Sequence, residues 1–435
     1  MNNLAAWMLT QEARALLTRL DRVRPFALHM PMVTAAAISP AAQVAIESHM
    51  IRGKKVLKTL VHNYIRWLLC PQGQQSTPDI AQRRFNIIRF KFNHILTQFD
   101  IFADVLSQRS EHETGVWVAG LDDAAADALA LPGYYHAPPV ICYLDRGHGA
   151  AIRRAHTRLP GGNSNPVAVI QIPRERMVGS GIASSLVHEV GHQAAALLNL
   201  NNSFRPVLRE MQRKDAPHRI AWQFWERWIS EVIPDFWAVA KVGITATAGL
   251  INVVSLPRAL VFRLDMEDPH PAPYMRVKLG CALGQALYPH RQWDNLNKLW
   301  ESFYPLTGVN QQICRQIAGL EATLPGLVYL LVNHRPLSLR GKSLKEALNV
   351  GERQPARLSA YYQMWHSLPN RAYEVLPTLA FAVIGQAKSD GKITPEEESD
   401  RLAKLLTYWA VRSALNASAV GAAQPKLREA QKMLF

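Results

Sequence analysis

The segment SSLVHEVGHQAAALL (Ser184–Leu198) places His188 and His192 four residues apart, with Glu189 directly after the first histidine. Four residues advance an α-helix by about 400°, so both imidazoles project from one face and can bind a single tetrahedral ion. Glu189 lies about 100° around the helix, where its carboxylate can reach a metal-activated water without binding the metal. The pattern HExxH therefore predicts a zinc site with Glu189 as general base.

A second stretch, WERWISEVIPDFWAV, contains acidic residues that could complete such a site. A random HExxH is expected in roughly a few per cent of chains with this many histidines, so a third ligand matters. Glu231 and Asp235 lie among tryptophans and aliphatic residues, where an unpartnered carboxylate is costly to bury. A metal ion for Glu231, and the outer nitrogen of a ligating histidine for Asp235, would satisfy both. Pro234 between them predicts a kink or the start of a helix.

These residues resemble the gluzincin metallopeptidases, in which HExxH on one helix is completed by a glutamate on a later helix, commonly as ExxxD. The resemblance implies that His188, His192 and Glu231 are the ligands of one Zn²⁺ ion. It also implies that Glu189 is the general base and that Asp235 orients a ligating histidine. The activity that follows from the resemblance is hydrolysis of peptide bonds.

The segment DPHPAPYMR (Asp268–Arg276) narrows the resemblance. It is similar to the His-Pro…Arg element that follows the glutamate ligand in the peptidase M48 group, which also favours a glycine before the second histidine, as Gly191 is here. The resemblance implies that His270 and Arg276 face the scissile carbonyl and stabilise the oxyanion, with Tyr274 as a further candidate. Such donors in a dry cleft contribute several kcal/mol. The alternative is that His270 only caps a loop between two prolines.

The hydrophobic pattern predicts an α+β fold that is predominantly helical. Apolar residues at three- and four-residue spacings predict helices at residues 3–24, 39–69 and 77–108. Short β-branched and aromatic runs predict strands at residues 114–120, 139–144 and 166–172. We expect a helix at 122–131, a basic helix before the third strand, and an almost wholly helical chain after the HExxH segment. The small sheet is expected to pack on the HExxH helix in a zincin-like core.

Three regions follow from this pattern: an N-terminal helical region, a metallopeptidase core and a C-terminal helical region, at residues 1–112, 113–290 and 291–435. The M48 resemblance covers roughly residues 115–290. Around residues 370–415 the chain is similar to TerB-like helical modules, in which a DG turn links two helices. Local signals predict the same helix–turn–helix, with Thr394 as N-cap, Pro395 at the first helical position and Glu397 completing a capping box.

Composition and charge limit the class of protein to which this chain can belong. An apolar fraction of 48% in 435 residues is typical of a folded globular chain. The net charge of +15 is concentrated in the flanks, because residues 1–114 carry 14 Lys and Arg against 8 Asp and Glu, whereas residues 115–268 carry 15 against 14. Basic flanks favour nucleic acid, acidic lipid or an acidic protein as partner, or they are solvated helix faces.

Four scattered cysteines without a CxxC pair favour free thiols in a reducing compartment. The first residues do not resemble a signal peptide, and the longest uncharged run, at residues 242–257, is too short to span a membrane. We therefore expect a soluble cytoplasmic protein, although this sequence pattern is also compatible with delivery to another cell.

Three hypotheses of function follow. The first is a zinc endopeptidase whose substrate is a protein or peptide, bound in extended form along an edge strand at residues 166–172. The second is a non-catalytic or regulatory protein with the same fold, which binds nucleic acid or an acidic partner through its basic flanks. The third is a delivered effector protease, that is, a toxin.

Overall fold

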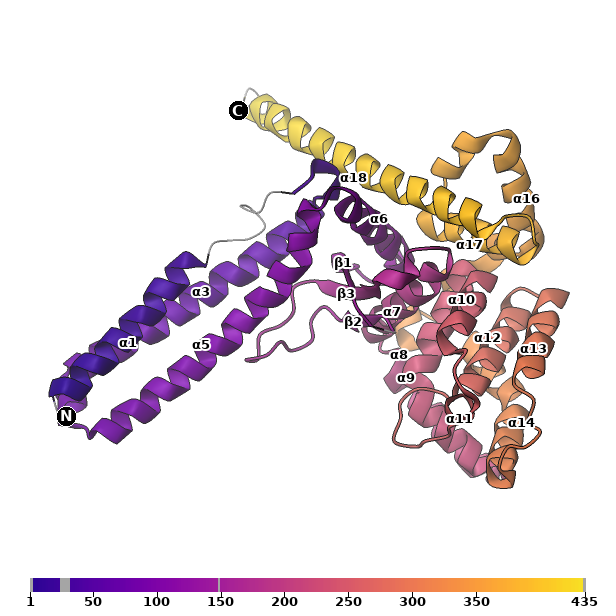
Figure 1. Cartoon of the computed structure of the whole chain (residues 1–435), viewed down its shortest axis with the longest axis horizontal. Coiled ribbons are helices and arrows are strands. Elements are labelled where there is room, and N and C mark those ends of the chain that lie inside the picture. Colours follow the sequence, from indigo (N-terminus) through magenta and orange to yellow (C-terminus); the bar gives the residue numbers. More distant parts are fainter. Residues whose placement is uncertain (1–2, 24–31, 148, 433–435) are drawn as a thin grey trace. The chain divides into compact units, whose positions relative to one another are not determined.

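A computed structural model describes residues 3–23, 32–147 and 149–432 of the chain, and it is predominantly helical with one small sheet. The chain forms two compact units (Figure 1). The first comprises the described residues of Met1–Ala119, Arg153–Ala168 and Ala410–Phe435, and the second those of Gly120–Ile152 and Val169–Trp409. The division into three regions made from the sequence stays a prediction.

Three long helices make up most of the first unit: α1 (Asn3–Arg22), α3 (Pro40–Leu69) and α5 (Pro78–Ser107), which pack against one another. All three were predicted from the sequence, apart from Arg24, which lies outside the described residues. Ser39 begins α3 as expected, because its hydroxyl accepts a hydrogen bond from the amide of Ala42 and Pro40 follows it.

The sheet has three strands: β1 (Val140–Asp145), β2 (Ala151–Arg153) and β3 (Ala168–Pro173), in the order β1-β3-β2. The two buried strands β1 and β3 confirm the predictions for residues 139–144 and 166–172. However, β3 is the central strand, so the expectation that it forms an edge is wrong, because β2 pairs with its second side. The expected basic helix before β3 is also wrong: β2 and turns occupy its described residues.

The predicted strand at residues 114–120 is wrong as well. These residues belong to α6 (His112–Leu129), which also contains most of the helix expected at residues 122–131. The glycines that suggested strand ends instead permit close packing, because a Cβ at Gly120 would lie 2.3 Å from the carbonyl oxygen of Leu406. Val116 and Val118 are both buried although they point to different sides of the helix, so burial overrides their preference for strands.

The HExxH helix is α7 (Gly181–Leu197), which begins a few residues after β3. It packs against α8 (Leu200–Lys214), α9 (Arg219–Val242), α10 (Ile244–Val254) and α17 (Pro377–Ser389). The helix α12 (Pro273–Leu287) packs against α9 and α10, and it also contacts α13 (Arg291–Phe303) and α14 (Gln311–Asn333). The HExxH helix therefore lies at the centre of the second unit.

The tryptophans near the predicted glutamate ligand form part of the core, as expected. Trp222, Trp225, Trp228 and Trp237 are all buried, and the indole of Trp225 donates a hydrogen bond to Thr323. Large aromatic side chains at one face of α9 thus fix this helix among its neighbours.

The helix–turn–helix near the C-terminus is confirmed. Thr394 and Glu397 form reciprocal hydrogen bonds between their side chains and backbone amides at the start of α18 (Pro395–Lys432). Gly391 adopts a left-handed conformation in the turn after α17. All four cysteines are free, as predicted. None of the helices in the described part of the chain is both long enough and apolar enough to cross a membrane.

Candidate metal centre

The centre is built where α7 and α9 touch. A Cβ atom at Gly191 would lie 2.7 Å from the Cα atom of Pro234, so the glycine permits the two backbones to approach closely. No helix begins at Pro234, where the sequence predicted a kink or a helix start. The helix α9 continues through this residue from Arg219 to Val242. Burial of the surrounding tryptophans stabilises α9 in spite of the missing hydrogen bond.

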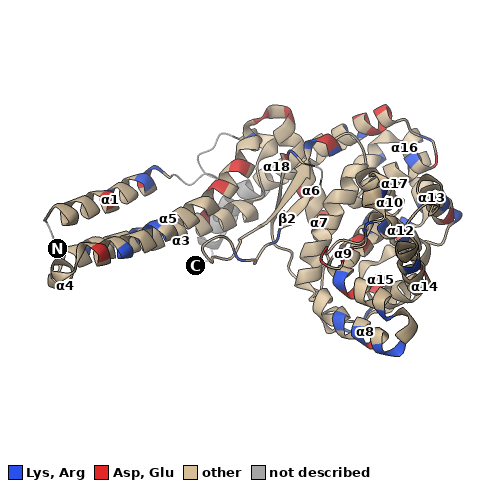
Figure 2. Cartoon of the chain, turned by 60° about the horizontal axis from the view of Figure 1, so that its bottom comes forward, with Lys and Arg blue, Asp and Glu red and all other residues tan. Residues whose placement is uncertain are grey.

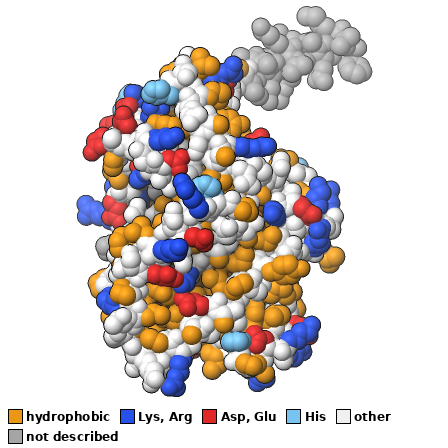
Figure 3. Space-filling view, turned by 90° about the vertical axis from the view of Figure 1, so that its right-hand side faces the viewer, with side chains coloured by type: hydrophobic (Ala, Val, Ile, Leu, Met, Phe, Trp, Pro, Cys, Tyr) orange, Lys and Arg blue, Asp and Glu red, His pale blue; other side chains and the backbone are white. Residues whose placement is uncertain are grey.

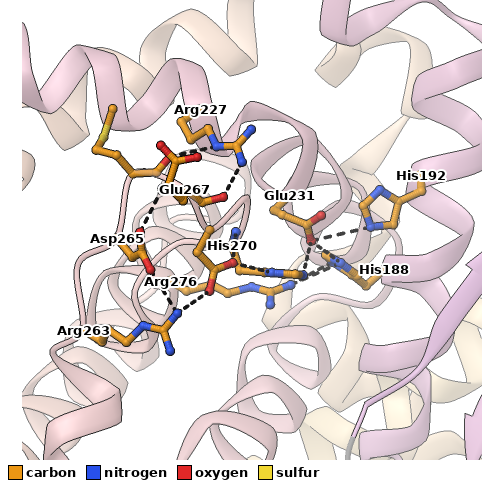
Figure 4. A network of polar contacts seen from close by, with 11 residues as sticks. His188, His192, Arg227, Glu231, Arg263, Asp265, Glu267, His270 and Arg276 are labelled. Carbon is orange, nitrogen blue, oxygen red and sulfur yellow. Dashed lines mark hydrogen bonds and ion pairs between the residues drawn. The ribbon is translucent and has the colours of Figure 1, made fainter.

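Two histidines of α7 and one glutamate of α9 converge at this contact (Figure 4). Oε2 of Glu231 lies 3.2 Å from Nε2 of His188 and 3.6 Å from Nε2 of His192. One donor atom from each residue lies within 4.8 Å of the others. The three side chains are between 9% and 20% exposed, so they are largely shielded while the set remains accessible. Together they could hold one metal ion.

Asp235 fixes the orientation of the first histidine. Its Oδ1 atom lies 2.8 Å from Nδ1 of His188, on the side of the ring opposite Glu231. Asp235 also accepts two hydrogen bonds from the guanidinium of Arg276, at 2.7 and 2.8 Å. This bidentate pair is buried, and one of its nitrogens lies 3.2 Å from the imidazole of His188.

The charges in the centre are strongly coupled. Burial favours the neutral form of each carboxyl group, but His188 and His192 outweigh it and hold the pKa of Glu231 well below its usual range. Burial and Arg276 would lower the pKa of His188, but Asp235 and Glu231 outweigh them and raise it to about 9. Burial is likewise outweighed at Asp235, whose pKa is lowered to about 2, chiefly by Arg276. Glu231 and Asp235 are therefore ionised acceptors at neutral pH.

Glu189 follows His188 on α7 and is itself buried. It is close enough to Arg276 to help stabilise the positive charge of the guanidinium. The structure thus places a buried carboxylate on the same helix as the two histidines, and its expected role as general base stays a prediction.

The loop before α12 brings His270 to the edge of the centre. Nε2 of His270 lies 3.8 Å from Oε2 of Glu231, and Oδ1 of Asp268 is bonded to both the backbone amide and Nδ1 of His270, at 2.9 and 2.8 Å. Arg227 of α9 donates hydrogen bonds to the carbonyls of Met266 and Glu267 and so anchors the same loop (Figure 4). His270 thus both takes part in a local turn and lies near the ligand set.

Tyr274 lies in different surroundings. Its ring packs against Phe262, with centroids 5.0 Å apart, and against the ammonium group of Lys278. Its backbone carbonyl accepts a hydrogen bond from Trp300. These contacts associate Tyr274 with the packing of α12, and its expected role beside the oxyanion stays a prediction.

Glu398 and Lys388 support the helix α7, and no pattern in the sequence indicated this role. The side chain of Glu398, which is 1% exposed, accepts hydrogen bonds from the backbone amide of Ser180, at 2.8 Å, and from its hydroxyl group. Ser180 directly precedes α7, so the carboxylate caps the helix that carries the two histidines. Lys388 forms an ion pair with the same carboxylate at 2.7 Å. A partner 218 residues away could not be inferred from local spacing.

Comparison with protein family models, with curated proteins and with solved structures gave no significant match for this chain.

Proposed function

We propose that the protein is a zinc-dependent endopeptidase of the gluzincin type, with an M48-like catalytic core. The observation that supports this proposal is the convergence of His188, His192 and Glu231, from two separate helices, on a space that suits one ion. Two imidazole nitrogens and one carboxylate oxygen form the donor set that catalytic zinc uses in thermolysin-like enzymes, with a fourth position left for water or substrate.

The residues around the ligands suit this chemistry. A bound zinc ion would supply a more acidic water molecule and a Lewis acid for the peptide carbonyl. Glu189 would accept the proton of the attacking water and transfer it to the departing amine. Asp235 would keep Nδ1 of His188 protonated, so that Nε2 is free to bind the metal.

His270 and Arg276 are proposed to stabilise negative charge on the carbonyl oxygen. His270 is the better placed of the two, because its side chain is 57% exposed and Nε2 points toward Glu231 (Figure 4). Arg276 is buried and engaged with Asp235, so its charge would act through the electrostatic field of the centre as well as by orienting Asp235.

The test is cleavage of an unfolded protein by the zinc-loaded chain and by its Glu189→Gln variant. Unfolded casein and a mixture of random peptides serve as substrates, and bound zinc is measured by elemental analysis. We expect the variant to retain one zinc ion per chain and to lose at least about a thousandfold in cleavage rate. Glu175→Gln, in the exposed segment before α7, is the matched control and should cleave as the natural chain does.

Two results would contradict the proposal. One is a chain that binds no zinc at micromolar concentration after reloading. The other is cleavage that Glu189→Gln leaves unchanged. A different outcome would favour the hypothesis of a non-catalytic binding protein. In that case the zinc-loaded natural chain would cleave neither substrate but would bind an RNA or an acidic protein. The Lys and Arg residues available for such binding are distributed over many helices, including α3, α5 and α8 (Figure 2).

A further inference from the structure

A groove separate from the metal centre lies on the outer side of α12. It has a volume of about 690 Å³ and is lined by residues of α12, α13 and α14. Lys278 and Cys281 of α12 line it, whereas Arg276 of the same helix contacts His188. Figure 3 looks at the side of the molecule on which α13 and α14 lie, and it shows hydrophobic side chains gathered across this face with acidic side chains among them.

The apolar part of the groove has helical spacing. Leu324, Val328 and Val332 follow one another at intervals of four residues and therefore form a stripe along α14, about 12 Å long at 1.5 Å per residue. Tyr329, which is 68% exposed, extends this stripe at the surface. An open apolar groove between helices is the geometry that binds the apolar face of a short amphipathic helix.

The polar part of the groove is acidic. Glu321 and Asp294 line it, and Lys278 is the one basic residue among the described residues that do so. The ammonium group of Lys278 is already bound by Glu321, at 2.6 Å, and by Glu301. Lys278 is thus paired with two carboxylates, and Asp294 adds a third acidic side chain to this groove, in a protein whose net charge is +15.

Pro325 lies inside α14, about one turn after Glu321, and has no amide hydrogen. Both residues line the groove. Carboxylates thus prevail at this end, and they call for a partner that donates hydrogen bonds and carries positive charge.

We propose that this groove binds a cationic amphipathic helix of a partner protein. Leucine-like side chains of the partner would occupy the stripe along α14, and a Lys or Arg side chain would bind near Asp294 and Glu321. Binding would not require zinc, so this inference is independent of the peptidase proposal.

The test uses a fluorescein-labelled 14-residue peptide with Leu and Lys at helical spacing, titrated with the full chain and followed by fluorescence anisotropy. The control peptide has Glu in place of every Lys. Because the chain carries a net charge of +15, general electrostatic attraction favours the Glu peptide. A preference for the Lys peptide therefore reports a local acidic site. We expect the Lys peptide to bind at least about tenfold more tightly.

Three variants locate the site. Asp294→Asn is expected to weaken binding about threefold and the uncharged polar substitution Val328→Asn at least tenfold. Val328 is buried, so Tyr329→Ala is included as a variant of an exposed residue, with a loss of at least threefold expected. Glu352→Gln removes the same type of charge outside the groove and should bind the peptide as the natural chain does.

Tighter binding of the Glu peptide would overturn the inference, and so would affinity for the Lys peptide that Asp294→Asn and Tyr329→Ala leave unchanged. Loss of binding in Glu352→Gln as well would show an unspecific charge effect and would also overturn it.

Discussion

Oδ1 of Asp235 lies 2.8 Å from Nδ1 of His188, and the same carboxylate holds the guanidinium of Arg276. Asp235 follows Glu231 by four residues, so one face of α9 supplies both the carboxylate beside Nε2 of His188 and the carboxylate that fixes its opposite side. Arg276 compensates the second negative charge in this buried environment.

Replacing Asp235 by Asn should weaken zinc binding by about 10- to 100-fold, because His188 loses the charged partner of its outer nitrogen. The buried guanidinium of Arg276 also loses its counter-ion, so the free energy of unfolding should fall by about 3 kcal/mol. Competition with a chromophoric chelator and urea denaturation measure the two effects. Asp268→Asn, which alters the carboxylate beside His270, is the control and should leave zinc affinity within about twofold. Equal affinities of all three proteins would exclude the orienting role of Asp235.

Replacing Glu398 by Gln should destabilise the HExxH helix, because the amide of Ser180 loses a buried, charged acceptor at the helix N-terminus. We expect the free energy of unfolding to fall by about 1–3 kcal/mol and zinc affinity to fall with it. Glu397→Gln, at the neighbouring position, preserves its own capping box and serves as the control. If Glu398→Gln matches that control in urea denaturation and zinc affinity, the C-terminal helices do not support the centre.

The pair formed by Asp268 and His270 can be tested by a double-mutant cycle. Asp268 holds the imidazole ring, so Asp268→Asn should lower kcat by about tenfold with little change in zinc content. In a chain that already carries His270→Gln, the same substitution should have no further effect, because the residue acts through the ring. Additive effects on kcat would show that Asp268 acts on the reaction independently of His270.

Lys241 gives a prediction for pH. Burial lowers its pKa to about 8 from 10.5 in the unfolded chain, so the unfolded chain binds more protons between these values. The contribution of Lys241 to stability is therefore unfavourable below pH 8 and improves as the pH rises toward 10.5. Lys241→Met should raise the free energy of unfolding by about 2 kcal/mol at pH 7, and the gain should diminish between pH 8 and 10.5. Lys298→Met, at an exposed position, is the matched control. If the gain in the free energy of unfolding of Lys241→Met instead grew with pH, the prediction would be contradicted.

The sequence predicted most of the centre because its residues are locally spaced. His188, Glu189 and His192 lie within one turn or so of helix, and Glu231 and Asp235 lie on one face of the next long helix. Their burial cost indicated that each needed a partner, and the structure brings Glu231 and Asp235 to opposite sides of His188.

The failures have a common cause, which is that long-range packing overrides local preference. Residues 114–120 have the composition of a strand, but Gly120 packs against the backbone of Leu406 and the segment continues a long helix. The central position of β3 depends on its pairing with β2, whose three residues are too few to give a periodic signal. The cap that Glu398 provides is equally non-local.

Gly191, the fourth residue of HEVGH, has a geometric role in the centre. The helix α9, which carries Glu231, passes so near Gly191 that even the methyl group of an alanine would push the two helices apart. Such a displacement would move both histidines away from Glu231 at once, so the three side chains could no longer share one ion although none of them is lost. The separation between these donor atoms therefore depends partly on a residue that has no donor side chain.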